Sequence, residues 1–395
     1  MSDILAAKKI FFIIGTRPEA IKMAPLIIKL KEETDFNVVL CVSGQHKEML
    51  YQVLTIFDLY PDYDLDVMQP KQDLYDITSK TLMCLRDVLK KEKPEMVLVH
   101  GDTATAFSGA LAAFYEQIPV GHVEAGLRTY NIYSPWPEEM YRQLVSRIAC
   151  MHFTPTELSK DNLKREGISE DKIYITGNTV IDALNSVLNK INVNPDIKHR
   201  ICRNLVAAGL SVEKIKQWEK GRKIILITAH RRENFGQGLQ NIGTAILQLT
   251  HLYPHIDFIY PMHLNPVVRN TIKDVLRQAD ANPPNLFLIE PLEYLEFSFL
   301  MSLSLLVLTD SGGIQEEAPS LGKPVLVMRN TTERPEAVTA GTVKLVGTDI
   351  SQIIETVSAL IENMSLYESM SNAINPYGDG SACDKILAVL HRECV

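Results

Sequence analysis

Short apolar segments recur along this chain of 395 residues, and each is followed by a polar turn and a stretch with helical periodicity. In the first half the pattern predicts strands at residues 9–14, 38–42, 96–100, 120–123, 152–154 and 173–175. In the second half it predicts strands at residues 224–228, 257–260, 286–289, 305–308, 325–328 and 343–345. Strands that alternate with helices indicate parallel sheets, and nearly continuous apolar runs indicate that both faces are covered.

The repeated pattern falls into two halves, which predicts an α/β chain of two Rossmann-like domains with a central cleft. We place the first domain at residues 1–180 and the second at 181–372, with a C-terminal helix at about 373–395 that packs back on the first domain. Residues 191–222 are polar and lack a strand pattern, so we interpret them as an elaborated edge of the second domain.

Composition narrows the class of protein. A formal net charge of −8 argues against a general nucleic-acid binder, although a few local cations could hold a phosphorylated small molecule. The apolar run at residues 10–14 is too short for a secretory signal or a membrane span. Six scattered cysteines without a Cys-x-x-Cys pair predict free thiols, a cytoplasmic location and no bound metal.

The most informative segment is Asp310–Glu317, which follows an apolar strand. Ser311, Gly312 and Gly313 would let the backbone approach an anion closely, and the N–H groups of a helix start would face that anion. Glu317 comes about one helical turn later, within reach of a ribose diol. The segment predicts a nucleotide-phosphate site, and the alternative is a strand-to-helix turn without a ligand.

Polar clusters also follow other predicted strands. They lie at residues 15–19, 43–46, 100–103, 124–128 and 229–234. Ligands of open parallel sheets bind at the carboxyl ends of the strands, so we expect these clusters to line one cleft. Any one of them alone could be a helix cap or a loop charge.

In the first cluster Thr16 and Glu19 have the spacing of a capping box, which competes with Pro18 as the first helical residue. Arg17 and Lys22 are the cations available for a diphosphate. The chain has no Gly-x-Gly-x-x-Gly after a strand and no Gly-x-x-x-x-Gly-Lys-Ser/Thr loop. A dinucleotide-dependent dehydrogenase and a P-loop nucleotidase are therefore both disfavoured.

Four carboxylates and a histidine are candidates for acid/base chemistry. Asp102 and Glu124 end predicted strands, and Glu138 and Glu139 follow a proline-rich loop. Carboxylates that converge repel one another, which raises at least one pKa and creates an acid/base pair. The alternative for Asp102 is a helix cap. His230 could bind or protonate a leaving phosphate, or could be a solvated loop residue, and Arg334 adds a cation.

Together these motifs resemble the non-hydrolysing UDP-N-acetylglucosamine 2-epimerases of bacteria, in order from about residue 9 to residue 375. The motifs are GTRPEA (15–20), GQH (44–46), HGDT (100–103), HVEAGLR (122–128), PWPEE (135–139), HRREN (230–234), DSGGIQEE (310–317) and TTERP (331–335). The resemblance implies a glycosyltransferase B-type fold and a cytoplasmic homodimer. It also implies reversible conversion of UDP-N-acetylglucosamine to UDP-N-acetylmannosamine without a cofactor, for surface polysaccharide synthesis.

The resemblance also implies roles for individual residues. Asp102, Glu124 and Glu138 would be the acid/base carboxylates, and His230 would act near the departing diphosphate. The residues that would hold the phosphates or the sugar are Arg17, Lys22, Ser311, Gly312, Gly313 and Arg334, and Glu317 would hold the ribose.

The chain departs from the family pattern near two of its sites. Leu292 stands where a family glutamine is reported near the nucleotide. In some members a second UDP-N-acetylglucosamine is an allosteric activator at a Gln-His-x-Gln motif and an Arg-Gln pair, which are QHKE (45–48) and KQ (71–72) here. Whether allosteric activation is retained stays open; the candidate residues are Gln45, His46, Gln72 and His263.

The chemistry of such an inversion matches the residues. The proton on C2 of an N-acetylhexosamine is not activated by an adjacent carbonyl, but expulsion of UDP from C1 gives a 2-acetamidoglucal without a redox cofactor. Reprotonation from the opposite face then requires a second acid/base group. The alternatives are a 2-epimerase of a modified UDP sugar (a diacetamido-uronate or a deoxy sugar), a hydrolysing epimerase, a glycosyltransferase of the same fold and a non-catalytic nucleotide-sugar sensor.

Overall fold

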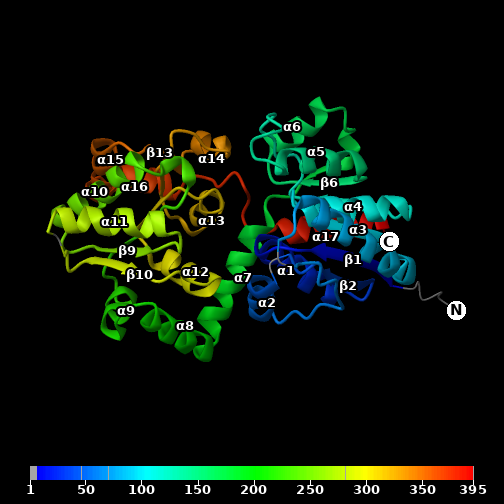
Figure 1. The fold of residues 1–395 in the computed structure, drawn as a ribbon, viewed down its shortest axis with the longest axis horizontal. Helices are drawn as coiled ribbons and strands as arrows, with labels where there is room; N and C mark the ends of the chain where they lie inside the picture. The colour runs from blue at the N-terminus through cyan, green and yellow to red at the C-terminus, as the bar shows by residue number, and fades with distance from the viewer. Residues whose placement is uncertain (1–6, 46, 70, 281, 395) are drawn as a thin grey trace. The chain divides into compact units, whose positions relative to one another are not determined.

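The computed structural model describes residues 7–45, 47–69, 71–280 and 282–394. The chain forms two compact units (Figure 1). One comprises the residues up to Asn185 together with those from Tyr377 onward, and the other is Ser186–Pro376. The chain passes from the first to the second within helix α7 (Thr179–Val193), slightly later than the predicted boundary.

A parallel sheet of seven strands forms the centre of the first unit, in the order β3-β2-β1-β4-β5-β6-β7. The strands are β1 (Lys8–Ile14), β2 (Phe36–Val42), β3 (Tyr63–Asp64), β4 (Met96–His100), β5 (Val120–Val123), β6 (Met151–Thr154) and β7 (Ile173–Ile175). The last five residues of β1 are fully buried, as expected for a central strand covered on both faces. The sequence pattern missed β3, because two residues make no apolar run.

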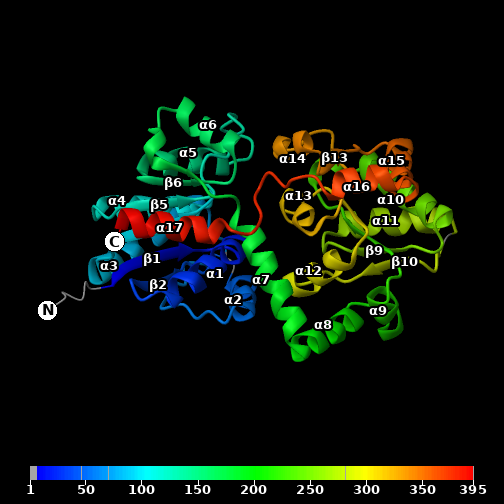
Figure 2. The same ribbon diagram turned by 180° about the vertical axis from the view of Figure 1, so that it is seen from behind.

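Helices cover both faces of this sheet. They are α1 (Arg17–Glu32), α2 (Lys47–Ile56), α3 (Leu74–Glu92), α4 (Ala104–Tyr115), α5 (Glu138–Ile148), α6 (Glu157–Arg165), the start of α7, a 3-10 turn η1 (Glu170–Lys172) and α17 (Ala382–Cys394). Figures 1 and 2 show α17 in red against the blue elements α1 and β1. Lys29 of α1 pairs with Asp384, and the ring of His391 lies 4.9 Å from that of Phe36.

The second unit is built on six parallel strands in the order β10-β9-β8-β11-β12-β13. They are β8 (Ile224–Thr228), β9 (Asp257–Pro261), β10 (Leu286–Ile289), β11 (Leu306–Thr309), β12 (Val325–Val327) and β13 (Val343–Leu345). All six were predicted to within one residue at either end. Their interior side chains form one core with the helices, centred on Ile225, Phe258 and Leu308.

Helices on both faces complete the second unit. They are α8 (Pro195–Ala207), α9 (Val212–Glu219), α10 (Gln237–Leu252), α11 (Pro266–Gln278), α12 (Tyr294–Leu303), α13 (Ile314–Glu317), α14 (Pro335–Ala340), α15 (Ile350–Glu362) and α16 (Met364–Ser371), with 3-10 turns η2 (Arg232–Asn234) and η3 (Ala318–Leu321). In Figure 1, α10 and α11 lie on one side of β9 and β10, and α8, α9 and α12 lie on the other. The polar segment 191–222 forms α8 and α9, and Asn204 donates to Glu296 of α12 at 2.7 Å. Among the described helices, none has the length and apolarity needed to cross a bilayer.

Each sheet has one topological switch point, where the strand order reverses. It lies between β1 and β4 in the first unit and between β8 and β11 in the second. Ligands of doubly wound sheets bind beyond the carboxyl ends of the strands at such points. The loops after these four strands hold residues 15–16, 101–103, 229–231 and 310–313, so four of the predicted polar clusters lie at switch points.

Candidate active site

The turn after β1 is held by the Glu19 carboxylate. It accepts hydrogen bonds from the backbone N–H groups of Gly15 at 2.9 Å and Thr16 at 2.7 Å, so the capping box forms, with Pro18 inside the first turn. The two interpretations of this motif are therefore compatible. The Thr103 hydroxyl donates to Glu19 at 2.6 Å, which joins the loops after β1 and β4. Burial raises the pKa of Glu19, and these hydrogen bonds partly oppose that rise.

Gly15 is required by close packing. A Cβ atom at this position would lie 2.1 Å from Thr105 Oγ1 and 2.4 Å from Ser43 Oγ. Those two hydroxyls are hydrogen-bonded to each other at 2.8 Å, and Thr105 also donates to Gln45 at 3.1 Å. The turn can therefore pass over β2 and α4 only without a side chain.

We expect Gly15→Ala to lower the free energy of unfolding by about 1–3 kcal/mol, the usual cost of overpacking. The added methyl group must displace the turn that precedes Arg17. Urea unfolding would measure the loss of stability. Gly167→Ala is not a clean control because its φ is +82°, whereas Gly313→Ala has open space and should unfold like the wild type. Unchanged stability of Gly15→Ala would contradict this packing argument.

Asp102 does not cap α4, so the helix-cap alternative was wrong. The N-cap is Thr103, whose side chain accepts from the backbone of Ala106 at 3.0 Å. The Asp102 carboxylate instead pairs with the guanidinium of Arg142 on α5, which also lies 3.3 Å from Glu139. Sequence reasoning missed Arg142, because nothing local connects it with a residue 40 positions earlier.

The two adjacent glutamates at the start of α5 have different surroundings. Glu139 is fully buried and accepts from the backbone N–H groups of Thr129 and Tyr130, both at 3.0 Å, and from Gln143 at 2.9 Å. It therefore fastens the loop that follows β5. Glu138 is partly exposed, and its carboxylate makes no hydrogen bond to any described residue. Of the pair, Glu138 is the one whose carboxylate is available for chemistry.

Glu124 follows β5 in a left-handed conformation with φ of +62°. Its carboxylate pairs with Lys22 and accepts from Asn178 at 2.9 Å, while His100 Nε2 lies 3.7 Å away. A Cβ on Gly101 would lie 3.8 Å from Glu124 Oε1, which places Glu124 beside the residue preceding Asp102. A strained backbone at a partly buried carboxylate is typical of functional sites.

The sequence predicted carboxylates that repel one another, but the structure gives two of them a cation each. Asp102 has Arg142 and Glu124 has Lys22. A cation at this range favours the charged form of a carboxylate and so offsets like-charge repulsion. Lys22, predicted to bind phosphate, thus contacts a predicted acid/base residue. Arg17 is the first residue of α1 and is partly buried.

In the second unit Asp310 orients the loop that carries His230. Asp310 is fully buried at the end of β11, and its Oδ2 accepts from the backbone N–H groups of His230 and Arg231, both at 2.7 Å, and from Asn234 at 3.2 Å. Its Oδ1 lies 3.4 Å from His230 Nδ1, so the imidazole turns Nδ1 toward the carboxylate. Burial lowers the pKa of His230, although Asp310 opposes this. Asp310 was not among the residues predicted to have a role in the site.

A pocket of about 170 Å³ lies beside His230. Its lining residues are Thr228, Ala229, His230, Pro261, His263, Pro291, Leu292, Phe297, Ser311 and Ile314. The ring of His263 stacks on that of His230 at 5.1 Å, and Leu292 contributes an apolar wall. A pocket with flat apolar walls and a few polar groups suits a small heterocycle.

The glycine turn after β11 leaves open space. A Cβ on Gly313 would meet nothing within 4 Å, and one on Gly312 would lie 3.9 Å from Arg231 Nη2. These glycines are thus not needed for packing, and a guanidinium lies beside them. The helix that follows, α13, has four residues and continues as a 3-10 turn.

Hydrogen bonds join the Arg334 turn to the glycine turn, and Glu317 is bonded to α12. Glu317 is buried and accepts from the Tyr294 hydroxyl at 3.0 Å. Arg334 pairs with Glu316, the residue before Glu317. Gln315 donates to the carbonyl of Ser311 at 3.1 Å and accepts from Thr332 at 2.6 Å, which joins the glycine turn to the Arg334 turn.

The four candidate allosteric residues come from both units. Gln45 lies in the first unit beside Thr105, and His46 lies outside the described residues. Gln72 stabilises its own loop, accepting from the backbone of Gln69 at 2.5 Å and donating to Val67 at 2.9 Å. His263 belongs to the second unit, in the pocket beside His230.

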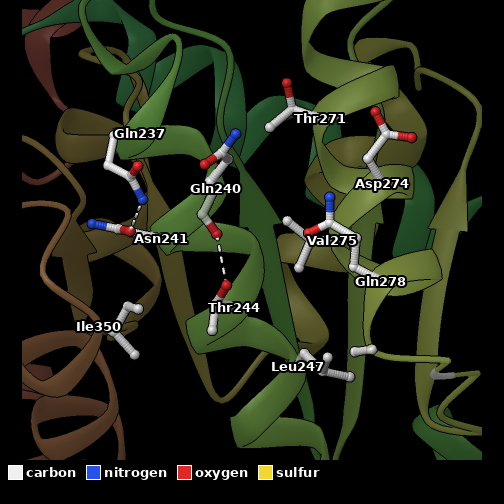
Figure 3. A pocket seen from close by; sticks show the side chains of 11 residues that line it. Gln237, Gln240, Asn241, Thr244, Leu247, Thr271, Asp274, Val275, Gln278 and Ile350 are labelled. Carbon is white, nitrogen blue, oxygen red and sulfur yellow. Dashed lines mark hydrogen bonds between the residues drawn. The ribbon is translucent and has the colours of Figure 1, made fainter.

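A larger hollow of about 470 Å³ lies on the outside of the second unit, between α10 and α11 (Figure 3). Amides and hydroxyls line it, and Gln237 donates to Asn241 at 2.8 Å. It contains no cation and none of the predicted site residues. Of these two hollows, the pocket beside His230 is the one lined by predicted site residues. Within the described ranges, no three His, Cys, Asp or Glu side chains gather as a metal-binding group.

The two sheets and their strand orders define a two-domain α/β protein of the glycosyltransferase B-type. A glycosyltransferase of Rickettsia africae ESF-5 shares this fold with a TM-score of 0.61 over 98% of both chains, at 15% sequence identity. Within this class, a model of the UDP-N-acetylglucosamine 2-epimerase family matches residues 28–391. The chain belongs to this family.

Individual relatives agree over nearly the whole chain. The UDP-N-acetylglucosamine 2-epimerase of Neisseria meningitidis serogroup A is 53% identical over 382 residues, which cover 97% of this chain and 99% of the relative. The enzyme of Escherichia coli K12 is 51% identical over 97% of this chain and 98% of its own. A crystal structure of the Neisseria meningitidis enzyme bound to UDP-GlcNAc has a TM-score of 0.85 and covers 98% of this chain and 100% of its own.

Proposed function

We propose that this protein reversibly epimerises C2 of UDP-N-acetylglucosamine, giving UDP-N-acetylmannosamine through elimination and re-addition of UDP. Its family and its 52% identity to an enzyme crystallised with UDP-GlcNAc support this substrate. The observation that carries the proposal is that Asp102 and Glu124 follow two paired strands, β4 and β5, and that each has its own cation. Two positioned carboxylates are what proton removal from one face and return to the other require.

The second unit would hold the UDP portion. The pocket beside His230 suits the uracil ring, and Glu317 would accept from the ribose diol. The open turn at Gly312 and Gly313 leaves space for phosphate, with Ser311 and the cation Arg334 in the same bonded network. In the first unit, Arg17 and Lys22 are the cations proposed to hold phosphates or sugar.

In the elimination step one carboxylate takes the C2 proton while the C1–O bond to UDP breaks, leaving a 2-acetamidoglucal. UDP then re-adds at C1, and a second carboxylate returns a proton to the opposite face of C2. Asp102, Glu124 and Glu138 are the acid/base candidates. His230 would act near the departing diphosphate: its Nδ1 faces the Asp310 carboxylate, so the ring donates from Nε2 to a phosphate oxygen when it is protonated. Fixed donors around that developing charge would supply the largest rate contribution.

Proton NMR of the purified protein with UDP-N-acetylglucosamine in D₂O tests the proposal. We expect an anomeric signal of UDP-N-acetylmannosamine to grow, with deuterium entering C2. Free N-acetylmannosamine plus UDP would instead indicate the hydrolysing reaction. If nothing changes, the modified UDP sugars are tested next, and turnover of a diacetamido-uronate or a deoxy sugar alone would overturn the substrate assignment.

We also propose that the enzyme acts in the cytoplasm as a homodimer and supplies surface polysaccharide synthesis. An exposed apolar surface on α3 and α4 supports the dimer. Met83, Phe114 and Tyr115 are each more than half exposed there, and Met83 and Tyr115 line one shallow hollow. Exposed aromatic and methionine side chains that cluster on one face are typical of protein interfaces.

Met83→Asp is therefore expected to convert a dimer of 44.4 kDa subunits into monomers at micromolar concentration, because a charge would be buried unpaired in the interface. Light scattering after size exclusion measures the mass. Met364→Asp is the matched control, since Met364 is similarly exposed on α16 of the second unit. A wild-type monomer, or a dimer that survives Met83→Asp, would contradict this interface.

A further inference from the structure

Arg329, just after β12, joins two loops through one guanidinium. Its side chain is 4% exposed. It forms a close pair with Glu233 through Nε, with Nη2 3.3 Å from the other carboxylate oxygen. On the other side Nη1 and Nη2 donate to Glu333 at 2.9 and 3.1 Å. A planar guanidinium with five donors is suited to holding two carboxylates in fixed directions at once, which a lysine cannot do.

Each carboxylate belongs to a loop that carries a site residue. Glu233 lies in η2, three residues after His230, and Glu333 immediately precedes Arg334. A second link runs alongside, because Asn234 donates to the carbonyl of Met328 at 3.1 Å and to Asp310 at 3.2 Å. The loops after β8, β11 and β12 are thus fastened to one another next to Arg329.

Arg329 also neutralises charge between the two carboxylates. The Glu233 and Glu333 side chains are 48% and 41% exposed, whereas the cation between them is buried. Arg329 lowers the pKa of Glu333 to about 2, so this carboxylate is ionised at neutral pH. Without Arg329, two anions would stand unneutralised near Arg231 and Arg334, where they would repel a diphosphate.

We propose that Arg329 is a positioning residue, which holds the His230 loop and the Arg334 turn in the arrangement that binds the diphosphate of the UDP sugar. Arg329 acts through these loops and not by contact with the substrate. The inference rests on the proposed function for the identity of the ligand. That Arg329 joins the two loops rests on the hydrogen bonds alone, so the mobility of the loops can be measured without UDP.

The experiment compares Arg329→Met and Arg329→Lys with the wild-type protein, using UDP as the probe in titration calorimetry. We expect Arg329→Met to weaken UDP binding on the order of 10- to 100-fold, because both loops must then be ordered when UDP binds. Arg329→Lys should fall between the two, because it keeps the charge and loses the fork. Hydrogen exchange of peptides spanning residues 230–235 and 330–335 should become faster in both variants.

Arg222→Lys is the matched control. Arg222 likewise holds a carboxylate in a fork, here the buried one of Asp257, with Nε and Nη2 at 2.7 and 2.6 Å from its oxygens. Asp257 begins β9, so this pair lies at the amino end of the strands, away from the predicted site. Arg222→Lys should lower stability but leave UDP affinity and the exchange of both loop peptides unchanged.

The outcomes separate the two proposals. If the wild-type protein does not bind UDP, the proposed function fails, and the exchange data still test Arg329. If the loop peptides exchange at the wild-type rate in Arg329→Lys, or if Arg222→Lys weakens UDP binding equally, the positioning role is overturned. Should Arg329→Met fail to fold, Glu333→Gln serves in its place, because it removes one ion pair with almost no change of shape.

Discussion

Asn in place of Asp102 is expected to lower turnover by about 10²–10⁴-fold, the contribution of one general acid/base group. The amide has nearly the shape of the carboxylate but cannot exchange the C2 proton. UDP affinity should stay within about twofold, since the proposed UDP contacts lie largely in the second unit. Turnover would be measured by the NMR assay at saturating substrate, and UDP affinity by calorimetry.

The replacement also weakens the ion pair with Arg142, so stability must be followed in parallel. Glu139 remains within 3.3 Å of that guanidinium, which limits the cost of the lost partner. Asp87→Asn is a suitable control, because Asp87 forms an exposed ion pair with Arg86 in the same unit. Turnover near the wild-type rate, or equal losses of turnover and UDP binding, would show that Asp102 has no catalytic role.

Acidification from pH 6.5 toward pH 4 is expected to destabilise the first unit steeply. Three buried histidines lie on adjacent strands: His100 on β4, His122 on β5 and His152 on β6. Burial lowers their pKa values from 6.5 to about 4, 3 and 4 respectively. Below pH 6.5 the histidines of the unfolded chain therefore bind protons, whereas those of the folded chain do not. The free energy of unfolding consequently rises with pH between about pH 4 and pH 6.5. Each histidine contributes about 1.4 kcal/mol per pH unit between its two pKa values.

Carboxylates with shifted pKa values change stability in a lower pH range than the histidines do, or with the opposite sign. Glu333, with a pKa lowered to about 2, loses its contribution only below about pH 4.5. Glu19, with a raised pKa, binds its proton more readily in the folded state and so opposes the histidines. The slope between pH 6.5 and about 4.5 thus reports the histidines, reduced by groups such as Glu19.

Urea unfolding at half-unit pH steps would measure this slope, and His152→Leu should reduce it by about one histidine's share. His152 is the suitable position because neither ring nitrogen has a hydrogen-bond partner among the described residues, so Leu leaves no group unpaired. His199→Leu, on the exposed surface of α8, should leave the slope unchanged. A slope that is the same in His152→Leu and the wild type would contradict a neutral buried imidazole.

Much of the candidate site was predictable because its signals are local. The strands at residues 96–100, 120–123 and 224–228 were predicted to the residue, since apolar runs bounded by polar turns need no knowledge of the rest of the chain. The glycine turn and the loop of His230 follow such strands directly, so their place at the carboxyl edge came with the strand prediction. The helix cap at Thr16 was likewise predictable, because the capping box lies within four consecutive residues.

The partners of those residues were not predictable, because they depend on how distant segments close together. Lys22 and Glu124 are 102 positions apart, His230 and Asp310 are 80 apart, and Arg329 and Glu233 are 96 apart. No local pattern distinguishes Glu138 from Glu139, yet the fold buries one under two backbone N–H groups and leaves the other available. The like-charge repulsion expected from several acidic residues was offset by cations that only the packing of α1 and α5 brought near.

The sequence by itself thus determined the alternation of strands and helices, the strand ends where polar residues gather, and the family, because all of these are written in short contiguous motifs. The tertiary structure alone decided which carboxylate meets which cation, which histidine is neutral, and which arginine fastens two loops. These are properties of atoms brought within hydrogen-bonding distance by strand order and helix packing. Their energies depend on the burial and charge found there, which no short segment carries by itself.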